Sequence, residues 1–405
     1  MLTPLAGGYN RRVDLITGSP TRKIDAVRER LAREGRDVIL LSTGQPGFLP
    51  PTFLRERLAQ ALLDEGFKRL YSYTPTPGYA DVREAIAEDL AALGGPRMEP
   101  DDILVTAGGQ EAMFATLSTI LEPGDKVILM DPTYFGYRPI VEYLGGRVEW
   151  VRAPPSLGFQ PDEERLKEAF TRDVKAVVLV SPDNPTGRLL STESAKLVAD
   201  LAVDTGAWIV YDEAYKTLVF EGEHVYLYKL APDNTISINT FSKDPGFPGW
   251  RLGYLYGPGW IVGKIRLVSE ELVYCPPSIA QVAAKIYLED REGRLRHLEY
   301  AREFLKTRME AMAGALEEML PEAVFARPGG SMFITVDLSS YLSKASITSE
   351  DLSVKLLDEE SVATVPGRYF GPSGDTMLRL SFATETPERI REGIGRLARL
   401  LERLA

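Results

Sequence analysis

Short apolar runs alternate with helix-length segments along the middle of the chain, from about residue 100 onward. The runs are rich in valine and isoleucine, and their successive residues stay apolar instead of alternating with polar ones. Such runs are typical of parallel strands that are buried on both faces of a sheet. The pattern therefore predicts an α/β core. Its runs are DILVTAG, KVILMD, AVVLVSPDNPTG, WIVYDEAY and TISINTFSK.

The pattern changes after about residue 280. Residues 283–320 carry apolar positions at helical spacing and predict one long amphipathic helix. Strand-like segments follow at 326–338 and 376–383, and the chain closes with another helical pattern. We expect a smaller α+β domain here. The predicted division is an N-terminal segment, 1–45, packed partly with the small domain, a large domain, 46–285, and a small C-terminal domain, 286–405.

Composition and charge argue against several classes of partner and site. The chain has 405 residues and a net charge of −11, with both signs mixed along it, which argues against nucleic acid or an anionic membrane as the main partner. One cysteine excludes an internal disulfide, and two histidines are too few for a zinc site, so we expect no metal. No run approaches the roughly 20 apolar residues of a membrane span. The N-terminus lacks the charge order of a secretory signal, and we expect a cytoplasmic protein.

Polar residues and glycines follow the predicted strands. Taken singly, each has an ordinary explanation: a turn at Asn184, a helix N-cap at Asp212 and a tight corner at Gly108 and Gly109. Ligands of parallel sheets, however, bind beyond the carboxyl ends of the strands, so these positions should share a cleft. The full set is Gly108, Gly109, Asn184, Asp212, Tyr215, Thr240, Ser242 and Lys243.

Together these residues match the needs of pyridoxal 5'-phosphate. A lysine amine, here Lys243, forms a Schiff base with its aldehyde, and a carboxylate, here Asp212, keeps its ring nitrogen protonated so that the ring can take up electrons. Asn184 and Tyr215 could bind the ring oxygen. The phosphate needs backbone N–H groups at a helix N-terminus near Gly108 and Gly109, with Thr240, Ser242 and Arg251 as further donors.

The chain resembles the fold-type I pyridoxal-phosphate enzymes, specifically the class I/II aminotransferases. The resemblance rests on several segments in the family's order, from about residue 40 to the end. They are LSTGQPGF, YTPTPGYADVREAIA, DPTYFGY, NPTG, DEAY, SK followed by GWRLG, RPGGSMF, VPGRYFG and LRLSFA. The resemblance implies an aspartate-aminotransferase-like fold: a large domain with a mostly parallel sheet flanked by helices, plus the smaller α+β domain.

The resemblance also implies roles for single residues. Lys243 would hold the cofactor and shuttle a proton at the substrate Cα, and Tyr134 would stack on the ring. Arg379 would grip the substrate α-carboxylate, with Gly44 and Asn184 close to the substrate. Tyr73 would reach the phosphate in the neighbouring subunit, which implies a homodimer with shared active sites. Gln110, beside the glycine corner, joins the cofactor-binding set.

Two features depart from the family pattern: Thr240 stands where serine is common, and residues 244–248 are rich in proline and glycine. The resemblance implies a two-step exchange of an amino group between an L-amino acid and a 2-oxo acid, with glutamate and 2-oxoglutarate as one pair. A lyase that eliminates at Cβ or Cγ on the same scaffold is the alternative. A non-catalytic regulator would need an added DNA-binding domain, for which residues 1–40 are too short.

Overall fold

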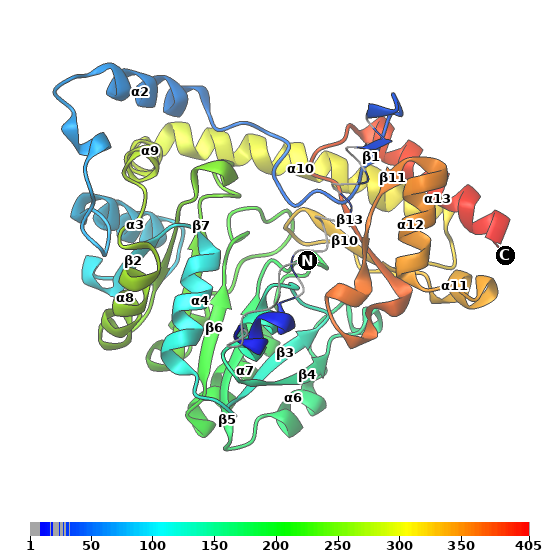
Figure 1. Cartoon of the computed structure of the whole chain (residues 1–405), viewed down its shortest axis with the longest axis horizontal. Coiled ribbons are helices and arrows are strands. Elements are labelled where there is room, and N and C mark those ends of the chain that lie inside the picture. Colours follow the sequence, from blue (N-terminus) through cyan, green and yellow to red (C-terminus); the bar gives the residue numbers. More distant parts are fainter. Residues whose placement is uncertain are drawn as a thin grey trace.

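The computed structural model describes residues 9–16, 18, 24, 27, 30, 31 and 33–404. Much of the expected N-terminal segment, 1–45, lies outside these residues. Figure 1 shows a large α/β body, with the smaller C-terminal part to one side and α10 (Arg291–Met319) running along both. No helix within the described part of the chain is long and apolar enough to cross a bilayer.

The large body is built on a seven-stranded sheet with the order β2-β8-β7-β6-β5-β3-β4. Only β8 runs in the opposite direction to the other six strands, so the prediction of a mostly parallel sheet is confirmed. The expected runs form β2, β3, β5, β6 and β7, whereas β4 and β8 were not anticipated. The strands are β2 (Ile103–Thr106), β3 (Lys126–Asp131), β4 (Arg147–Arg152), β5 (Val174–Val180), β6 (Trp208–Asp212), β7 (Thr235–Thr240) and β8 (Gly253–Tyr256).

Helices cover both faces of this sheet, which explains why its strands are apolar throughout. Along β5, Val178 and Val180 pack into one cluster with α4, α5 and α8, while Val177 and Leu179 pack on the opposite face against α6 and α7. At the β2 edge a further cluster joins α2, α3 and α9 to the sheet. The helices are α2 (Thr52–Leu63), α3 (Ala80–Ala92), α4 (Gly109–Ile120), α5 (Tyr137–Tyr143), α6 (Glu163–Ala169), α7 (Thr192–Thr205), α8 (Gly259–Val273) and α9 (Ser278–Glu289).

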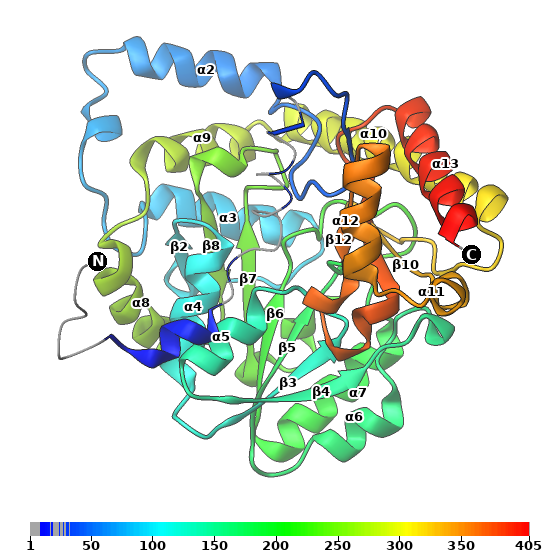
Figure 2. The ribbon, with the colours of Figure 1, turned by 45° about the vertical axis from the view of Figure 1, so that its right-hand side comes forward.

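The C-terminal part is an antiparallel sheet with the order β12-β13-β10-β9, covered by helices (Figure 2). Its core combines residues of α10, α13 and the two central strands. A parallel pair of strands, β1 (Ile39–Leu40) with β11 (Val362–Ala363), ties the N-terminal segment to it. The other elements are β9 (Val324–Phe325), β10 (Phe333–Asp337), β12 (Val365–Pro366), β13 (Met377–Ser381), α11 (Ser339–Ala345), α12 (Ser349–Glu360) and α13 (Pro387–Leu404). The division at residues 45 and 285 stays a prediction.

The prediction of a single long helix over 283–320 was wrong, because two helices, α9 and α10, occupy this stretch. They meet at Asp290, whose backbone is not helical and whose Oδ1 accepts a hydrogen bond from Gly293 N at 2.9 Å. An aspartate in this position caps the first turn of α10. The hydrophobic periodicity continued across the break and concealed it.

We expect Asp290→Ala to lower stability by about 1 kcal/mol, because the first turn of α10 loses its cap. Asp290→Asn is the matched control, since asparagine caps equally well but cannot form the ion pair with Arg57. That ion pair contributes little, because the Arg57 side chain is 54% exposed. Thermal midpoints of the three proteins measured side by side test this. Equal midpoints for Asp290→Ala and the parent chain would show that the cap does not stabilise the helix junction.

Candidate active site

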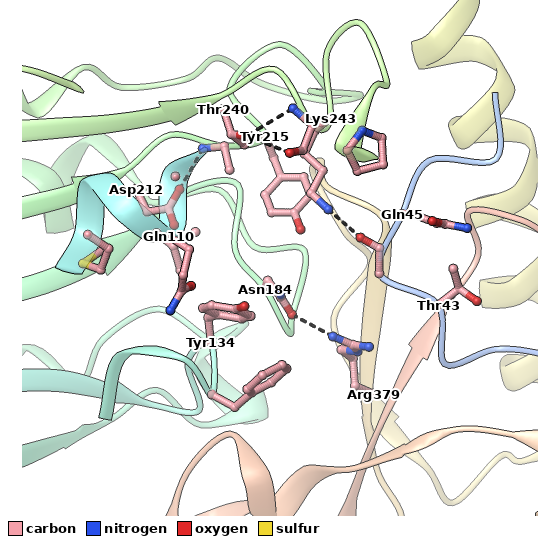
Figure 3. Close-up of a pocket in the computed structure, with 18 of the residues that line it drawn as sticks. Thr43, Gln45, Gln110, Tyr134, Asn184, Asp212, Tyr215, Thr240, Lys243 and Arg379 are labelled. Atoms are coloured by element: carbon pink, nitrogen blue, oxygen red, sulfur yellow. Dashed lines mark hydrogen bonds between the residues drawn. The ribbon is translucent and has the colours of Figure 1, made fainter. Parts of the chain in front are cut away.

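A cavity of about 590 Å³ lies at the carboxyl ends of β5, β6 and β7 and extends to β13. The register explains this convergence, because Asp212 at the end of β6 is paired with both Val180 and Ile238. Figure 3 shows side chains from both sheets pointing into this space. The predicted residues that line it are Gly44, Gly109, Gln110, Tyr134, Asn184, Asp212, Tyr215, Thr240, Ser242, Lys243, Arg251 and Arg379.

Lys243 follows β7, and its side chain crosses the cavity towards the N-terminal segment (Figure 3). Its Nζ donates a hydrogen bond to Gly44 O at 2.5 Å and lies 5.6 Å from the ring centroid of Tyr215. Burial, followed by repulsion from Arg379, lowers the pKa of Lys243 to about 8. A lysine in this setting is a competent nucleophile and base near neutral pH.

Asp212 ends β6 and turns its carboxylate into the same cavity. Oδ2 accepts from Tyr137 Oη at 2.7 Å, and Oδ1 accepts from Ala214 N at 2.9 Å. Burial raises the pKa of Asp212 above its ordinary value despite these hydrogen bonds. Within the described residues no cation lies close enough to form an ion pair with this carboxylate, although the charge of Lys243 acts on it across the cavity.

Arg379 enters the cavity from β13 of the other sheet and is only 2% exposed. Its guanidinium donates to Ser42 O at 2.7 Å and to Asn184 Oδ1 at 3.3 Å, which leaves its Nε without a hydrogen-bond partner. The described residues place no carboxylate beside it, and burial lowers the pKa of Arg379 to about 10. A buried guanidinium with spare donors is a binding site for a carboxylate.

The glycine corner at the start of α4 is crowded. Gly108 has a φ of +101°, and a Cβ there would lie 2.6 Å from Arg251 Nη2. The guanidinium of Arg251 therefore lies close to the corner, and the positive φ of Gly108 favours glycine there. Thr240 Oγ1 donates to Ser242 Oγ at 2.9 Å, which places two hydroxyl groups on the same side of the cavity. N–H groups, a cation and hydroxyls gathered at a helix N-terminus form a site for an anion.

Three further predicted residues differ in how they lie relative to the cavity. Tyr134 lies at the cavity wall between Asp212 and Arg379, as Figure 3 shows, with its ring 5.2 Å from that of Tyr137. Gln110 lines the cavity from the first turn of α4. Tyr73 is not brought to this cavity: it is 85% exposed and packs edge-on against Tyr274 at 5.4 Å.

Sequence reasoning missed four residues that shape the site. Tyr137 holds Asp212, and its place three residues after Tyr134 at a helix start was a signal that could have found it. The carbonyl of Ser42 orients Arg379. Phe333 and Phe370 pack against that guanidinium, with ring centroids 4.3 and 5.2 Å from its carbon. Both rings lie in segments that carry the family resemblance, RPGGSMF and VPGRYFG, but the sequence assigned no role to either.

Comparison with known proteins agrees with this geometry. Residues 36–397 match the family described as aminotransferase class I and II. The chain is 35% identical to an aspartate/prephenate aminotransferase of Thermus thermophilus, over 98% of this chain and 99% of the relative. It is 34% identical to a probable N-acetyl-LL-diaminopimelate aminotransferase of Bacillus subtilis, over 93% and 92%.

A solved structure of the Thermus thermophilus aspartate aminotransferase with maleate superposes with a TM-score of 0.90 at 33% identity, covering 97% of this chain and 99% of that one. The relatives agree on the reaction type and differ in the substrates that their names give. With the family matched over most of the sequence, the chain belongs to the aminotransferase class I and II family and is an aminotransferase.

Proposed function

We propose that this aminotransferase uses pyridoxal 5'-phosphate, and that it moves an amino group from an L-amino acid to a 2-oxo acid in two half-reactions. The observation that carries the proposal is that Lys243, Asp212 and Arg379 meet in one cavity beside the anion site at the glycine corner. Glutamate and 2-oxoglutarate are proposed as one pair by analogy with the family.

The residues present fit the phosphate of the cofactor. Gly108 has no side chain to cover the start of α4, so the backbone N–H groups there would be accessible to an anion beside Arg251. Arg251 would supply the charge, and Thr240 and Ser242 would supply hydroxyl donors. The positive end of the α4 dipole adds to the attraction.

The residues also fit the ring. When bound, the cofactor supplies an aldehyde that accepts an amine and a protonated ring that takes up electrons. Asp212, a half-buried carboxylate without a cation, would pair with the ring nitrogen, and Tyr137 would fix the direction of that carboxylate. Asn184 and Tyr215 would donate to the ring oxygen, and Tyr134 would pack on its face.

Two residues would handle the substrate. Arg379 would bind the α-carboxylate through its spare donors, with Gly44 and Asn184 close by. Lys243, with its lowered pKa, would hold the cofactor and then move a proton at the substrate Cα.

We also propose a homodimer with shared sites. Tyr73 does not line the cavity of its own chain and is exposed together with Tyr274, which is 60% exposed. Pairs of exposed aromatic rings favour a contact surface. In such a dimer Tyr73 would reach the phosphate held by the other subunit.

The first test is the half-reaction with single amino acids. Purified holoenzyme mixed with one L-amino acid and no 2-oxo acid should convert the bound cofactor stoichiometrically to its amine form, followed by absorbance. Lys243→Ala should fold and show no conversion, while Lys229→Ala, an exposed lysine, should behave as the parent chain. Release of ammonia and pyruvate without an acceptor would instead indicate the lyase alternative.

A panel of donors in the same assay identifies the substrate. An acidic side chain needs a second cation, and the lysines and arginines among the described residues that line the cavity are Lys243, Arg251 and Arg379. Since these are assigned to the cofactor and the α-carboxylate, rapid conversion by glutamate would require a cation from the partner subunit or from outside the described lining. Absence of conversion by glutamate would refute the proposed pair.

The lowered pKa of Lys243 predicts the pH dependence of cofactor binding. An amine attacks an aldehyde only when it is uncharged, so the rate at which apoenzyme captures pyridoxal 5'-phosphate should rise with pH and level off above about 8. The ordinary value of 10.5 would place that rise more than two units higher. Stopped-flow absorbance across pH 6–10 measures it, and a midpoint near the ordinary value would contradict the buried setting.

Arg379→Lys should weaken the binding of the substrate α-carboxylate, because lysine cannot offer two parallel donors. We expect kcat/KM for the best donor to fall about 10- to 100-fold, which corresponds to a charged hydrogen bond of about 1.5–3 kcal/mol. Arg327→Lys is the matched control, since Arg327 forms a two-donor contact with Glu317 that is half exposed. An unchanged kcat/KM in Arg379→Lys would remove Arg379 from the site.

A further inference from the structure

An acidic residue directly follows each of the two central residues of the site: Glu213 follows Asp212, and Asp244 follows Lys243. Asp212 and Lys243 line the large cavity, whereas Glu213 and Asp244 line a separate small cavity of about 20 Å³. Backbone geometry explains the separation at β6, because consecutive side chains point to opposite sides of a strand. The small cavity thus lies beneath the active site, within the protein.

Glu213 is held by the sheet itself. Its carboxylate accepts from Tyr256 Oη at 2.8 and 3.0 Å and from Asn239 Nδ2 at 3.0 Å, and Lys216 Nζ lies 3.6 Å away. Glu213 is fully buried and Lys216 is 8% exposed. These contacts keep the carboxylate charged although burial opposes the charge, and they fix the end of β6.

Asp244 is held by helices instead. It accepts from Tyr287 Oη of α9 and from Arg294 Nη2 of α10 at 3.3 Å. The same Nη2 donates to Asp89 of α3 at 2.9 Å. The side chains of Arg294, Asp244 and Asp89 are 6%, 10% and 11% exposed. One guanidinium therefore joins the loop after Lys243 to two helices.

A second residue of α10 contacts the same loop. His297, one turn beyond Arg294, lies with Nε2 3.1 Å from Pro245 O. Burial lowers the pKa of His297, so the ring is neutral near pH 7, and Nε2 must carry the proton because a carbonyl oxygen only accepts. Arg294 and His297 thus hold the two residues that follow Lys243.

Stability alone does not account for this arrangement. Buried ion pairs rarely stabilise a protein more than well-packed apolar residues of the same volume would, because desolvation of the charges offsets their attraction. What they provide is geometry: each of the donors and acceptors has a fixed position. The position fixed here is that of the backbone beside Lys243, in a loop that lies outside the sheet.

We propose that Asp244, Arg294 and His297 are positioning residues, through which α10 sets the backbone that directs Lys243 into the active-site cavity. The inference rests on the proposed function of Lys243. The three residues do not line the large cavity. They act through the loop, so their loss should change how Lys243 meets the cofactor and leave the binding of the substrate carboxylate at Arg379 intact.

The test compares holoenzymes of the parent chain, Asp244→Asn and Arg294→Gln. Arg291→Gln is the matched control, because Arg291 pairs with Glu88 at 3.0 Å and so joins the same two helices, α10 and α3, through side chains that are 69% and 67% exposed. Three quantities are measured: the pH midpoint of the absorbance change of bound pyridoxal 5'-phosphate, the half-reaction rate at saturating donor with the apparent donor affinity, and the thermal midpoint.

We expect Asp244→Asn and Arg294→Gln to shift the absorbance midpoint and to slow the half-reaction at saturation by about tenfold or more, as a small misplacement of a reacting group does. The apparent donor affinity should stay near that of the parent chain. Arg291→Gln should match the parent in all three quantities. Arg294→Lys, which keeps the cation, should recover part of the rate.

The proposal is overturned if both variants melt earlier yet keep the parent absorbance midpoint and saturating rate, since that result describes a purely structural role. If Arg294→Gln does not fold, His297→Phe takes its place in the comparison and should show the same changes. This variant removes only the hydrogen bond to Pro245 and keeps the edge contacts with Phe48 and Tyr287. A parent chain that fails to bind pyridoxal 5'-phosphate would refute the proposed function itself, whatever the variants do.

Discussion

The site depends on the parallel course of β5, β6 and β7, because parallel strands end at one edge of the sheet. That edge offers backbone groups and side chains from stretches far apart in the sequence. Asp212 is paired in register with the last residue of β5 and with Ile238 near the end of β7. A shift of one residue in either pairing would turn the carboxylate away from the cavity.

Two charged groups of the cavity lack a partner of opposite charge within the described residues. Arg379 is buried without a carboxylate, and Asp212 forms no ion pair within the described residues. Burial of a charge costs free energy, and a ligand group of opposite charge beside it would offset that cost. In the proposed function, Asp212 would meet the cationic part of the ligand and Arg379 its carboxylate. The buried charges beneath them, at Glu213 and Asp244, are instead already compensated by the protein.

The sequence predicted those parts of the site whose position follows from their own element. Lys243 and Asp212 stand just past apolar runs, and the strand pattern alone puts them at the same edge. It did not predict contacts between distant elements, such as Phe370 on Arg379 or Arg294 beside Asp244. Periodicity also joined α9 to α10, because a helix cap at Asp290 interrupts the backbone without interrupting the apolar stripe.

Arg379 belongs to the four-stranded sheet, whereas Lys243 follows a strand of the seven-stranded one. In the proposed function, an amino acid with its carboxylate at Arg379 and its amine at Lys243 would therefore contact both sheets at once. The separation of the two sheets would then select for the distance between the amine and the carboxylate of the substrate. A molecule with only an amine, or with a more distant carboxylate, would contact one sheet and not the other.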